Sequence, residues 1–581
     1  MRFKLSKLSF RAGSYPDQVG TSVTDLEVVL LVGPNNSGKS LALREIENWC
    51  IGKNPTTKVV DVDRLGVLMP DTAEEAIEFL QQFKTKPPPN QPIGDGEIWI
   101  AFPTFRPGEP VHQERFNPNF FSMLFNSHDP QRQEACKQLT RILTVRLDGR
   151  ARFALSDPQP AGDLQSQPQN HLWTLFRNDE AREKVRALTR DAFGLYFVID
   201  PTAMTQFRVR MSSRPPETKA EEQALDNNAR AFHQGATLIT ELGDGIQTFT
   251  GLVSAVLSLP YQILLIDEPE AYLHPPLARR LGQNLCNLTK DRRASLIVAT
   301  HSADFVMGCI ESGANVQILR FTFENPRATT RLLDAIELKK LMNDPLLRST
   351  QALRGLFHKA VVVTESDKDR AFYEEINYRL QVEGRGISDA LFMNAQNWQT
   401  ISRVVRPLRV LGIPAAAIMD LDVLEQEEQS WESIYDVFAV DASTRTRIEQ
   451  CRQRVSQGLH TTPNMHDVND KRKCYKLNGI AAIPREYQTN VCTLIKELAE
   501  YGLFIVPVGE VESWFARDGV SHDSKRDWLP RVFSYMGSDP SSPEYIRPCD
   551  DGVWRFIDAV GQWITNPDRS GSAFLNSGTS G

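Results

Sequence analysis

The feature that most restricts the fold of this chain is the glycine-rich segment GPNNSGKS at residues 33–40. It directly follows the apolar run EVVLLVG (27–33), which predicts a buried strand, and it leads into a predicted helix from Ser40 to Cys50. In this order of elements, backbone N–H groups of the loop and of the helix N-terminus point toward phosphate oxygens. The segment therefore predicts an α/β domain that binds the phosphates of a nucleotide, and a chance glycine-rich turn is the alternative.

Two side chains of this segment supply what phosphate chemistry requires. Lys39 is expected to bring its positive charge to the β- and γ-phosphates of ATP, and the hydroxyl of Ser40 is expected to bind Mg²⁺. The other expected contacts with the nucleotide are made by Gly33, Asn35, Asn36, Ser37 and Gly38.

A second apolar strand, in ILLIDEPE (263–270), ends in acids. Asp267 is expected to hold Mg²⁺, directly or through water, and Glu268 is expected to polarise the attacking water as a general base at the γ-phosphate. The segment VATHSAD (298–304) places His301 at the end of another predicted strand, where it can sense the γ-phosphate. Acids that only cap the next helix, and a histidine without a special role, are the alternatives.

The composition narrows the kinds of partner and compartment. With 581 residues there is room for two to four domains of roughly 100–200 residues. The net charge of −7 excludes a bulk attraction to nucleic acid, so any DNA contact depends on local basic patches or on metal ions. The eight cysteines form no CxxC pair, which is typical of reduced thiols rather than of a zinc site or disulfide framework. Since no run of about 20 apolar residues is present, we expect a cytoplasmic protein without membrane contact.

The second half of the chain has three predicted strands that end in carboxylates, at 359–366, 414–420 and 503–509. The acids that we expect to bind metal there are Glu365, Asp369, Asp420, Asp422, Glu510 and Glu512. Because the carboxyl ends of parallel strands meet at one edge of a sheet, these side chains are expected to converge. Converging carboxylates repel one another, and Mg²⁺ or Mn²⁺ relieves that repulsion. Two such ions can activate water for attack on a phosphodiester, whereas acids that merely cap helices or solvate strand ends are the alternative.

Between the glycine-rich loop and the acidic strand lies ELGDGIQ (241–247), which resembles the signature loop of ATP-binding cassette ATPases. The resemblance depends on Gly243, Gly245 and Gln247, while the serine that is common in such loops is replaced by glycine or aspartate. In those ATPases the loop opens a helix that faces the γ-phosphate bound by the other subunit. The resemblance therefore implies a homodimer, or a higher homo-oligomer, formed through the ATPase heads with nucleotides between them.

The segment VVVTESDKDRAFYEEI (361–376) resembles the first motif of Toprim domains, and IPAAAIMDLD (413–422) resembles their D-x-D motif. Toprim families usually show E-G-x-x-D. The missing glycine leaves Asp367 and Asp369 as candidates, and the spacing favours Asp369. An ATPase followed by a Toprim domain resembles, over nearly the whole chain, the nucleases of the OLD (overcoming lysogenisation defect) family and the nuclease subunit of Gabija antiphage systems. In the OLD family a further lysine follows, and Lys525 is the residue available here.

This resemblance implies an ATP-regulated, metal-dependent DNA endonuclease that acts in antiphage defence on phage or other foreign DNA. Its catalytic residues are then Glu365, Asp420 and Lys525, besides Glu268 and His301 of the ATPase. The Gabija case also implies a separately encoded helicase as a partner. Two other interpretations stay open: an ATPase sensor or scaffold whose Toprim half is a non-catalytic platform that recruits another effector, and a nuclease that cuts RNA such as tRNA.

The expected fold is α/β, with an ATP-binding-cassette-type ATPase head followed by a Rossmann-like Toprim domain. The ATPase domain is expected at 1–336, with an inserted helical region at about 51–200 as a candidate dimerisation element. A linker helix (337–357), the Toprim domain (358–569) and a disordered tail (570–581) are expected to follow.

The second half also contains a small basic cluster in NDKRKCYKLNG (469–479). It has two interpretations, a contact with DNA phosphates or a solvated loop. Its members are Lys471, Arg472, Lys473 and Lys476.

Overall fold

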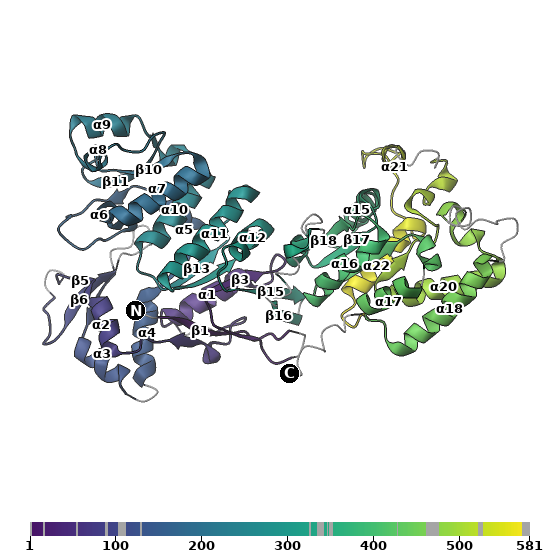
Figure 1. The fold of residues 1–581 in the computed structure, drawn as a ribbon, viewed down its shortest axis with the longest axis horizontal. Helices are drawn as coiled ribbons and strands as arrows, with labels where there is room; N and C mark the ends of the chain where they lie inside the picture. The colour runs from purple at the N-terminus through teal and green to yellow at the C-terminus, as the bar shows by residue number, and fades with distance from the viewer. Residues whose placement is uncertain are drawn as a thin grey trace. The chain divides into compact units, whose positions relative to one another are not determined.

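The chain divides into two compact units, Met1–Ala335 and Ile336–Gly581, and each is described by itself (Figure 1). Part of the predicted linker helix, at 337, 339–341, 346 and 348–351, and all of the predicted tail after residue 571 lie outside the residues that the structure describes. The residues described in this computed structural model are 3–14, 18–53, 56–87, 91–102, 112–127, 131–324, 327–333, 338, 342–345, 347, 352–426, 428–460, 474, 476–520 and 527–571.

A six-stranded sheet forms the centre of the first unit, in the order β16-β15-β3-β14-β13-β8. Its strands are β3 (Val28–Val32), β8 (Thr144–Leu147), β13 (Ile263–Asp267), β14 (Ser295–Ala299), β15 (Val316–Glu324) and β16 (Arg327–Leu333). β15, β3, β14, β13 and β8 run parallel, and β16 pairs antiparallel with β15. The strands β3, β13 and β14 are apolar and almost wholly buried, which is typical of a parallel sheet that is covered on both faces.

Helices surround this sheet, and α1 packs against β8, β13 and β14 (Figure 1). The helices of the first unit are α1 (Lys39–Cys50), α2 (Ala73–Gln81), α3 (Pro118–Phe125), α4 (Gln131–Leu143), α5 (Gly149–Ala154), α6 (His171–Arg177), α7 (Asp179–Phe193), α8 (Lys219–Gln223), α9 (Asn227–Gln234), α10 (Asp244–Ser258), α11 (Pro275–Arg292) and α12 (Ala303–Glu311). Two 3-10 turns, η1 and η2, lie at Val62–Arg64 and Ile239–Glu241.

Three small antiparallel sheets complete the first unit, in the orders β2-β1-β4, β5-β6-β7 and β10-β11-β12, with β9 beside β11. Their strands are β1 (Lys4–Ser9), β2 (Ser22–Thr24), β4 (Gly66–Leu68), β5 (Lys84–Thr85), β6 (Ile98–Phe102), β7 (His112–Phe116), β9 (Gln159–Pro160), β10 (Tyr196–Asp200), β11 (Gln206–Ser212) and β12 (Thr237–Leu238).

One strand of the central sheet comes from the region that the sequence predicts to be an insertion. β8 pairs in parallel with β13, so part of residues 51–200 belongs to the ATPase sheet itself. The sequence hides this strand because Arg146 lies at its centre, where a buried strand normally carries an apolar residue. The arginine is accommodated because its Nε donates to Glu47 Oε2 at 2.6 Å, and because β8 lies at the edge of the sheet.

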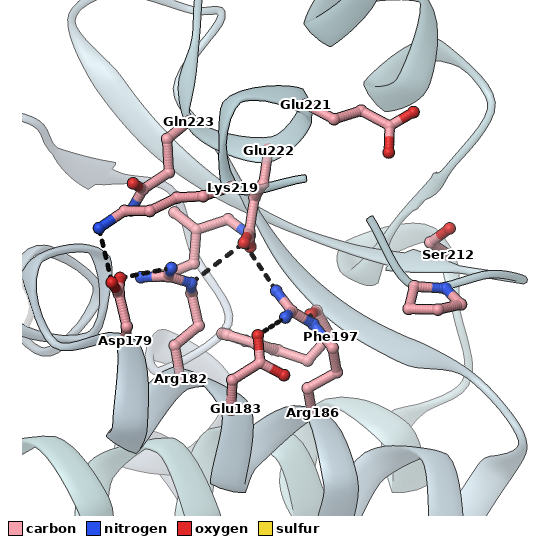
Figure 2. Close-up of polar contacts among 12 residues, drawn as sticks. Asp179, Arg182, Glu183, Arg186, Phe197, Ser212, Lys219, Glu221, Glu222 and Gln223 are labelled. Carbon is pink, nitrogen blue, oxygen red and sulfur yellow. Dashed lines mark hydrogen bonds and ion pairs between the residues drawn. The ribbon is translucent and has the colours of Figure 1, made fainter. Parts of the chain in front are cut away.

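A buried ion network joins α8 to α7 (Figure 2). Glu222 on α8 is only 1% exposed, and its Oε2 accepts from Arg182 Nε at 3.0 Å and from an Arg186 guanidinium nitrogen at 2.7 Å. The same two guanidinium groups also pair with Asp179 and Glu183 on α7. Since buried charges are tolerated only when they are paired and hydrogen-bonded, the network fixes α8 against α7.

The second unit is built on a four-stranded parallel sheet in the order β18-β17-β19-β20. The strands are β17 (Ala360–Thr364), β18 (Ala390–Asn394), β19 (Ala415–Met419) and β20 (Leu503–Ile505). The helices are α15 (Asp367–Val382), α16 (Trp398–Val410), α17 (Glu428–Val437), α18 (Ala442–His460), α20 (Arg485–Glu500), α21 (Trp528–Met536) and α22 (Gly552–Thr565). Short 3-10 turns are η3 (Ala352–Phe357), η4 (Leu421–Glu425), η5 (Gly479–Ala482), η6 (Val511–Ser513) and η7 (Ala516–Asp518).

The core of the second unit joins this sheet to α15, α21 and α22 through buried aromatic and aliphatic side chains. The parallel sheet agrees with the α/β fold expected for this half, while the edge strand β18 was not predicted. Its sequence ALFMN is short and only partly buried, so it gives a weak strand signal. In the part of the chain that the structure describes, no helix is both long and apolar enough to cross a membrane.

Candidate nucleotide site and carboxylate cluster

The predicted nucleotide-binding segments meet at the carboxyl edge of the central sheet. In the register of the three neighbouring strands, Ala299 of β14 lies between Leu31 of β3 and Asp267 of β13. The segments that follow these strands carry the glycine-rich loop, His301 and Glu268. They therefore leave the sheet side by side, at the edge where parallel sheets form binding sites.

The glycine-rich loop needs glycine at two positions. Gly33 has a φ of +139°, and a Cβ there would lie 2.1 Å from the carbonyl oxygen of Phe321. Gly38 has a φ of +98° and begins α1 as its N-cap. Asn36 also adopts a positive φ, of 60°, which asparagine tolerates better than most residues. These conformations bend the chain sharply between β3 and α1, as a loop that wraps a phosphate requires.

Lys39 is held by the loop that it is expected to serve. The side chain is buried, at 4% exposure, and Nζ donates to the carbonyl oxygens of Gly33 and Pro34, each at 2.8 Å. Nζ also lies 3.3 Å from Ser37 Oγ, while Asn35 is exposed at the tip of the loop. The predicted phosphate-binding cation is therefore placed within the glycine-rich loop.

The two predicted Mg²⁺ ligands are in contact. Ser40 Oγ donates to Asp267 Oδ1 at 3.0 Å, although the residues come from α1 and from the end of β13. Burial raises the pKa of Asp267, the hydrogen bond from Ser40 lowers it, and the nearby charge of Glu268 raises it further. A hydroxyl and a carboxylate at this spacing form the type of donor pair that holds Mg²⁺ beside the phosphates of a nucleotide.

The predicted base and sensor are also neighbours. His301 Nε2 lies 3.5 Å from Glu268 Oε1, and both side chains are partly exposed at the carboxyl edge. Glu268 has a φ of +49°, and its N–H donates to the carbonyl of Ala299 at 2.8 Å. A non-glycine residue in this left-handed region costs about 1–3 kcal/mol, and such strain gathers at functional sites.

Sequence reasoning missed Arg152, which lies on α5 in the predicted insertion. Its side chain is 3% exposed, and a guanidinium nitrogen donates to the backbone carbonyl of Glu268. Burial lowers the pKa of Arg152, and the charges of Glu270, Glu268 and Asp267 act against that change. No local motif marks this arginine, because its contact depends on the packing of α5 against the turn after β13, which carries Glu268 and Glu270.

The predicted signature loop lies at the start of α10. Gly243 is the N-cap of this helix, and Gln247 Nε2 donates to the carbonyl of Leu242 at 2.9 Å. A Cβ on Gly245 would lie 2.8 Å from the carbonyl oxygen of Tyr272, so the helix start packs closely on the turn that follows Glu268. In this single chain the loop thus contacts its own acidic turn, and its contact with a second subunit stays a prediction.

In the second unit, carboxylates gather where β17, β19 and β20 end. Glu365 directly follows β17, and its Oε1 accepts from the backbone N–H of Asp420, after β19, at 2.8 Å. Leu421 N–H donates to the carbonyl of Gly509, in the loop after β20, at 2.9 Å. The three acid-bearing segments are therefore hydrogen-bonded to one another at one edge of the sheet.

Burial and mutual repulsion raise the pKa values of these acids. The pKa of Glu365 is raised to about 7, first by burial and then by the charges of Asp422 and Asp369. Burial, together with the charge of Glu512, raises the pKa of Asp369 to about 6. Burial and the charges of Glu365 and Asp369 hold the pKa of Asp420 well above its usual range. The structure thus brings five of the six predicted metal ligands into one electrostatic cluster.

The other predicted residues are placed less centrally. Asp367 is 72% exposed and pairs with Arg370 at 2.7 Å, so the structure favours Asp369 over Asp367 as the member of the cluster. Glu510 is buried and begins η6, beside Glu512. Lys525 lies outside the described residues, as do Lys471, Arg472 and Lys473 of the basic cluster.

Lys476, which the sequence placed in the basic cluster, instead contacts the acids. Its Nζ lies 3.2 Å from Asp422 Oδ2 and 3.7 Å from Asp420 Oδ2. Its backbone is anchored to the acid-bearing loop, because Ser513 Oγ donates to the Lys476 carbonyl at 3.0 Å. The lysine therefore neutralises part of the negative charge of the cluster.

The donor set agrees in type with a divalent metal ion. Carboxylate oxygens are the ligands that Mg²⁺ and Mn²⁺ prefer, and the raised pKa values mark a surplus of negative charge. Within the described ranges, no group of three or more histidine, cysteine, aspartate or glutamate side chains is arranged to hold a metal ion. Metal binding here therefore requires these carboxylates to lie closer together than they do in this structure.

These pKa values predict how the stability of the chain depends on pH without metal. Because the pKa of Glu365 is raised, the folded state holds its proton more tightly than the unfolded state does. The contribution of protonated Glu365 to folding stability is therefore complete below about pH 4.5 and is lost as pH rises to about 7. In EDTA, the melting temperature is expected to fall between about pH 5 and pH 8, and to fall less in Glu365→Gln. Adding Mn²⁺ at pH 8 is expected to raise it in the wild type. Equal pH dependence in the two proteins, without a response to Mn²⁺, contradicts this electrostatic picture.

Comparison with known proteins supports an ATPase domain in the first unit. Residues 166–308 match the family model described as "AAA domain, putative AbiEii toxin, Type IV TA system". That segment includes β13, β14, Glu268 and His301, and the match supports an ATPase domain of the AAA or ATP-binding-cassette type in this part of the chain. No curated protein matches the sequence.

Among solved structures, the chain is similar to heads of SMC proteins. An SMC head bound to the C-winged helix domain of ScpA is 14% identical, with a TM-score of 0.33, and the match covers 58% of this chain and 99% of that one. The SMC head domain from Thermotoga maritima is 13% identical with a TM-score of 0.27, and the match covers 57% of this chain and 99% of that one.

Proposed function

We propose that this chain is an ATP-regulated, metal-dependent nuclease that cuts DNA, with an ATP-binding-cassette-type ATPase in its first unit and a Toprim nuclease in its second. The observation that carries the nuclease proposal is the convergence of Glu365, Asp420, Asp422 and their neighbours at one edge of a parallel sheet. The ATPase part is supported by the contact of Ser40 with Asp267 and by the family match over the acidic strand. In this proposal the substrate is phage or other foreign DNA.

In the ATPase, each residue has a part in binding or turning over ATP. Lys39 neutralises the phosphates, and Ser40 and Asp267 would hold Mg²⁺. Glu268 accepts a proton from the attacking water, and His301 lies close enough to orient that carboxylate or to contact the γ-phosphate. By the resemblance to ATP-binding cassettes, the loop with Gly243, Gly245 and Gln247 closes on the nucleotide of a second copy of the chain, which makes the protein a homodimer or a higher homo-oligomer.

In the nuclease, the acids would hold Mg²⁺ or Mn²⁺ through Glu365, Asp420 and Asp422, with Asp369, Glu510 and Glu512 beside them. When bound, such ions supply an activated water and stabilise the leaving oxygen of a phosphodiester. Lys476, together with Lys525 in the role that the resemblance implies, then brings positive charge to the phosphate. We further propose that the protein acts in antiphage defence, with a separately encoded helicase as its partner.

One observation favours the alternative in which the second unit is a non-catalytic platform. Lys476 already pairs with Asp420 and Asp422, and a permanent ion pair of this kind neutralises the acids without metal. In that case the unit recruits another effector under the control of the ATPase. The two possibilities differ in whether Asp420 and Glu365 are needed for cleavage.

Cleavage of supercoiled plasmid by the purified chain, with Mg²⁺ or Mn²⁺, tests the proposal. Glu365→Gln is expected to reduce cleavage by more than the roughly 10–100-fold loss that is typical of outer-shell partners of a metal site. Glu374→Gln is the matched control, because Glu374 is an exposed acid on α15 that pairs with Arg370. Metal-independent cleavage, or equal cleavage by wild type and Glu365→Gln, contradicts the nuclease site. Cleavage of tRNA but not of plasmid assigns the activity to RNA instead.

A further inference from the structure

Glu270 has a role in the structure that neither its motif nor the family match assigns. It lies two residues after Glu268, and its Oε1 accepts from the backbone N–H of His301 and from Thr300 Oγ1, each at 2.8 Å. Thr300 is fully buried, and Oε2 of Glu270 is also buried, without a hydrogen-bond partner among the described residues. The carboxyl group thus faces the protein interior and holds the start of the segment that carries His301.

The contacts of Glu270 complete a closed connection between two neighbouring strands. The backbone N–H of Glu268, after β13, donates to the carbonyl of Ala299 at the end of β14. Glu270 returns to the same strand end through His301 N–H, and the ring of His301 lies 3.5 Å from Glu268. Pro269 stands between the two acids, and its ring fixes φ and limits their relative movement. The distance between the Glu268 carboxylate and the His301 imidazole therefore depends on the hydrogen bonds that Glu270 accepts.

We infer that Glu270 is a positioning residue for ATP hydrolysis, which holds the His301 backbone so that the imidazole stays against Glu268. This inference rests on the proposed ATPase function. This role requires an acceptor oxygen at the end of a side chain as long as that of glutamate. Glutamine supplies such an oxygen at the same place, whereas methionine fills a similar volume without it. Burial raises the pKa of Glu270, and the hydrogen bonds from the His301 N–H and from Thr300 act against that change.

Steady-state ATP hydrolysis by the full chain tests the inference. Glu270→Met is expected to lower kcat by roughly 10–100-fold with little change in KM, because misplacing a catalytic group by about 1 Å can cost about 10²-fold. Glu270→Gln is expected to stay within about threefold of the wild type, since it keeps the acceptor oxygen. Glu311→Met is the matched control, because Glu311 pairs with Arg279 at the surface of α12.

A double-mutant cycle separates positioning from a general loss of structure. If Glu270 acts through His301, then Glu270→Met has little further effect on kcat in the His301→Ala background. Thr300→Val, which removes one of the two donors to the carboxyl group, is expected to give a smaller loss of kcat, and it replaces Glu270→Met if that variant does not fold.

The outcomes distinguish this inference from the function on which it rests. Wild-type turnover by Glu270→Met, an equal loss in Glu270→Gln and Glu270→Met, or full additivity with His301→Ala overturns the inference and leaves the ATPase standing. A wild-type chain that binds and hydrolyses no ATP overturns both.

Discussion

Replacing Glu268 with glutamine is expected to slow ATP hydrolysis by about 10²–10⁴-fold while ATP binding is retained, because the variant removes a general base without changing the size of the side chain. Glu268 lies at the carboxyl edge of the central sheet, with its carboxylate beside His301 and its neighbour Asp267 beside Ser40. The change leaves the contact between Asp267 and Ser40 intact. Release of phosphate and binding of a fluorescent ATP analogue measure the two quantities.

Glu180→Gln provides the control for this experiment. Glu180 is 82% exposed on α7 and pairs with Lys184 at the surface, so its loss is expected to leave both quantities unchanged. If Glu268→Gln hydrolyses ATP at nearly the wild-type rate, the general base is another group and the proposed site has been assigned wrongly.

Replacing Glu222 is expected to lower the free energy of unfolding by about 3–5 kcal/mol, which is the usual cost of removing one partner from a buried ion pair. Glu222→Gln leaves Arg182 and Arg186 buried with less compensating charge (Figure 2). It also disturbs the acceptor for the Ile199 N–H, which lies 3.0 Å from Glu222 Oε1. The expected result is a large downward shift of the denaturant midpoint of the first unit.

The neighbouring residue on α8 gives a matched comparison. Glu221 points away from the network in Figure 2 and pairs with Arg214; the Arg214 side chain is 48% exposed and the Glu221 side chain 16%, whereas Glu222 is 1% exposed. Because ion pairs with a solvent-exposed partner contribute about 0–1 kcal/mol, Glu221→Gln is expected to shift the midpoint much less. Equal shifts in the two variants contradict the view that burial makes the Glu222 network decisive for stability.

The placement of much of the candidate nucleotide site could be predicted because its sequence signals are local. The glycine-rich loop, Asp267 and His301 each follow an apolar strand, and strands β3, β13 and β14 lie side by side. The same logic predicted the acids after β17, β19 and β20. In each case the candidate residue follows its strand within a few positions of the sequence. The parallel sheet then brings the segments after these strands together at one edge.

The residues that escaped prediction depend on contacts between distant segments. Arg152 reaches the carbonyl of Glu268 from a helix that the sequence assigned to an insertion. Lys476 resembles a member of a basic loop until the backbone places it against Asp420 and Asp422. β8 was missed because Arg146 interrupts its apolar pattern. No periodicity or short motif reports such pairings, since each is decided by tertiary packing.

In the proposed function, the nucleotide state of the first unit controls cleavage by the second. The most direct test is plasmid cleavage by the wild type and by Lys39→Ala, each with Mn²⁺ and with or without ATP. We predict that ATP changes the cleavage rate of the wild type and that this response disappears in Lys39→Ala, which still cuts. A response to ATP that persists in Lys39→Ala, or cleavage by the wild type that is the same with and without ATP, contradicts the coupling of the two units.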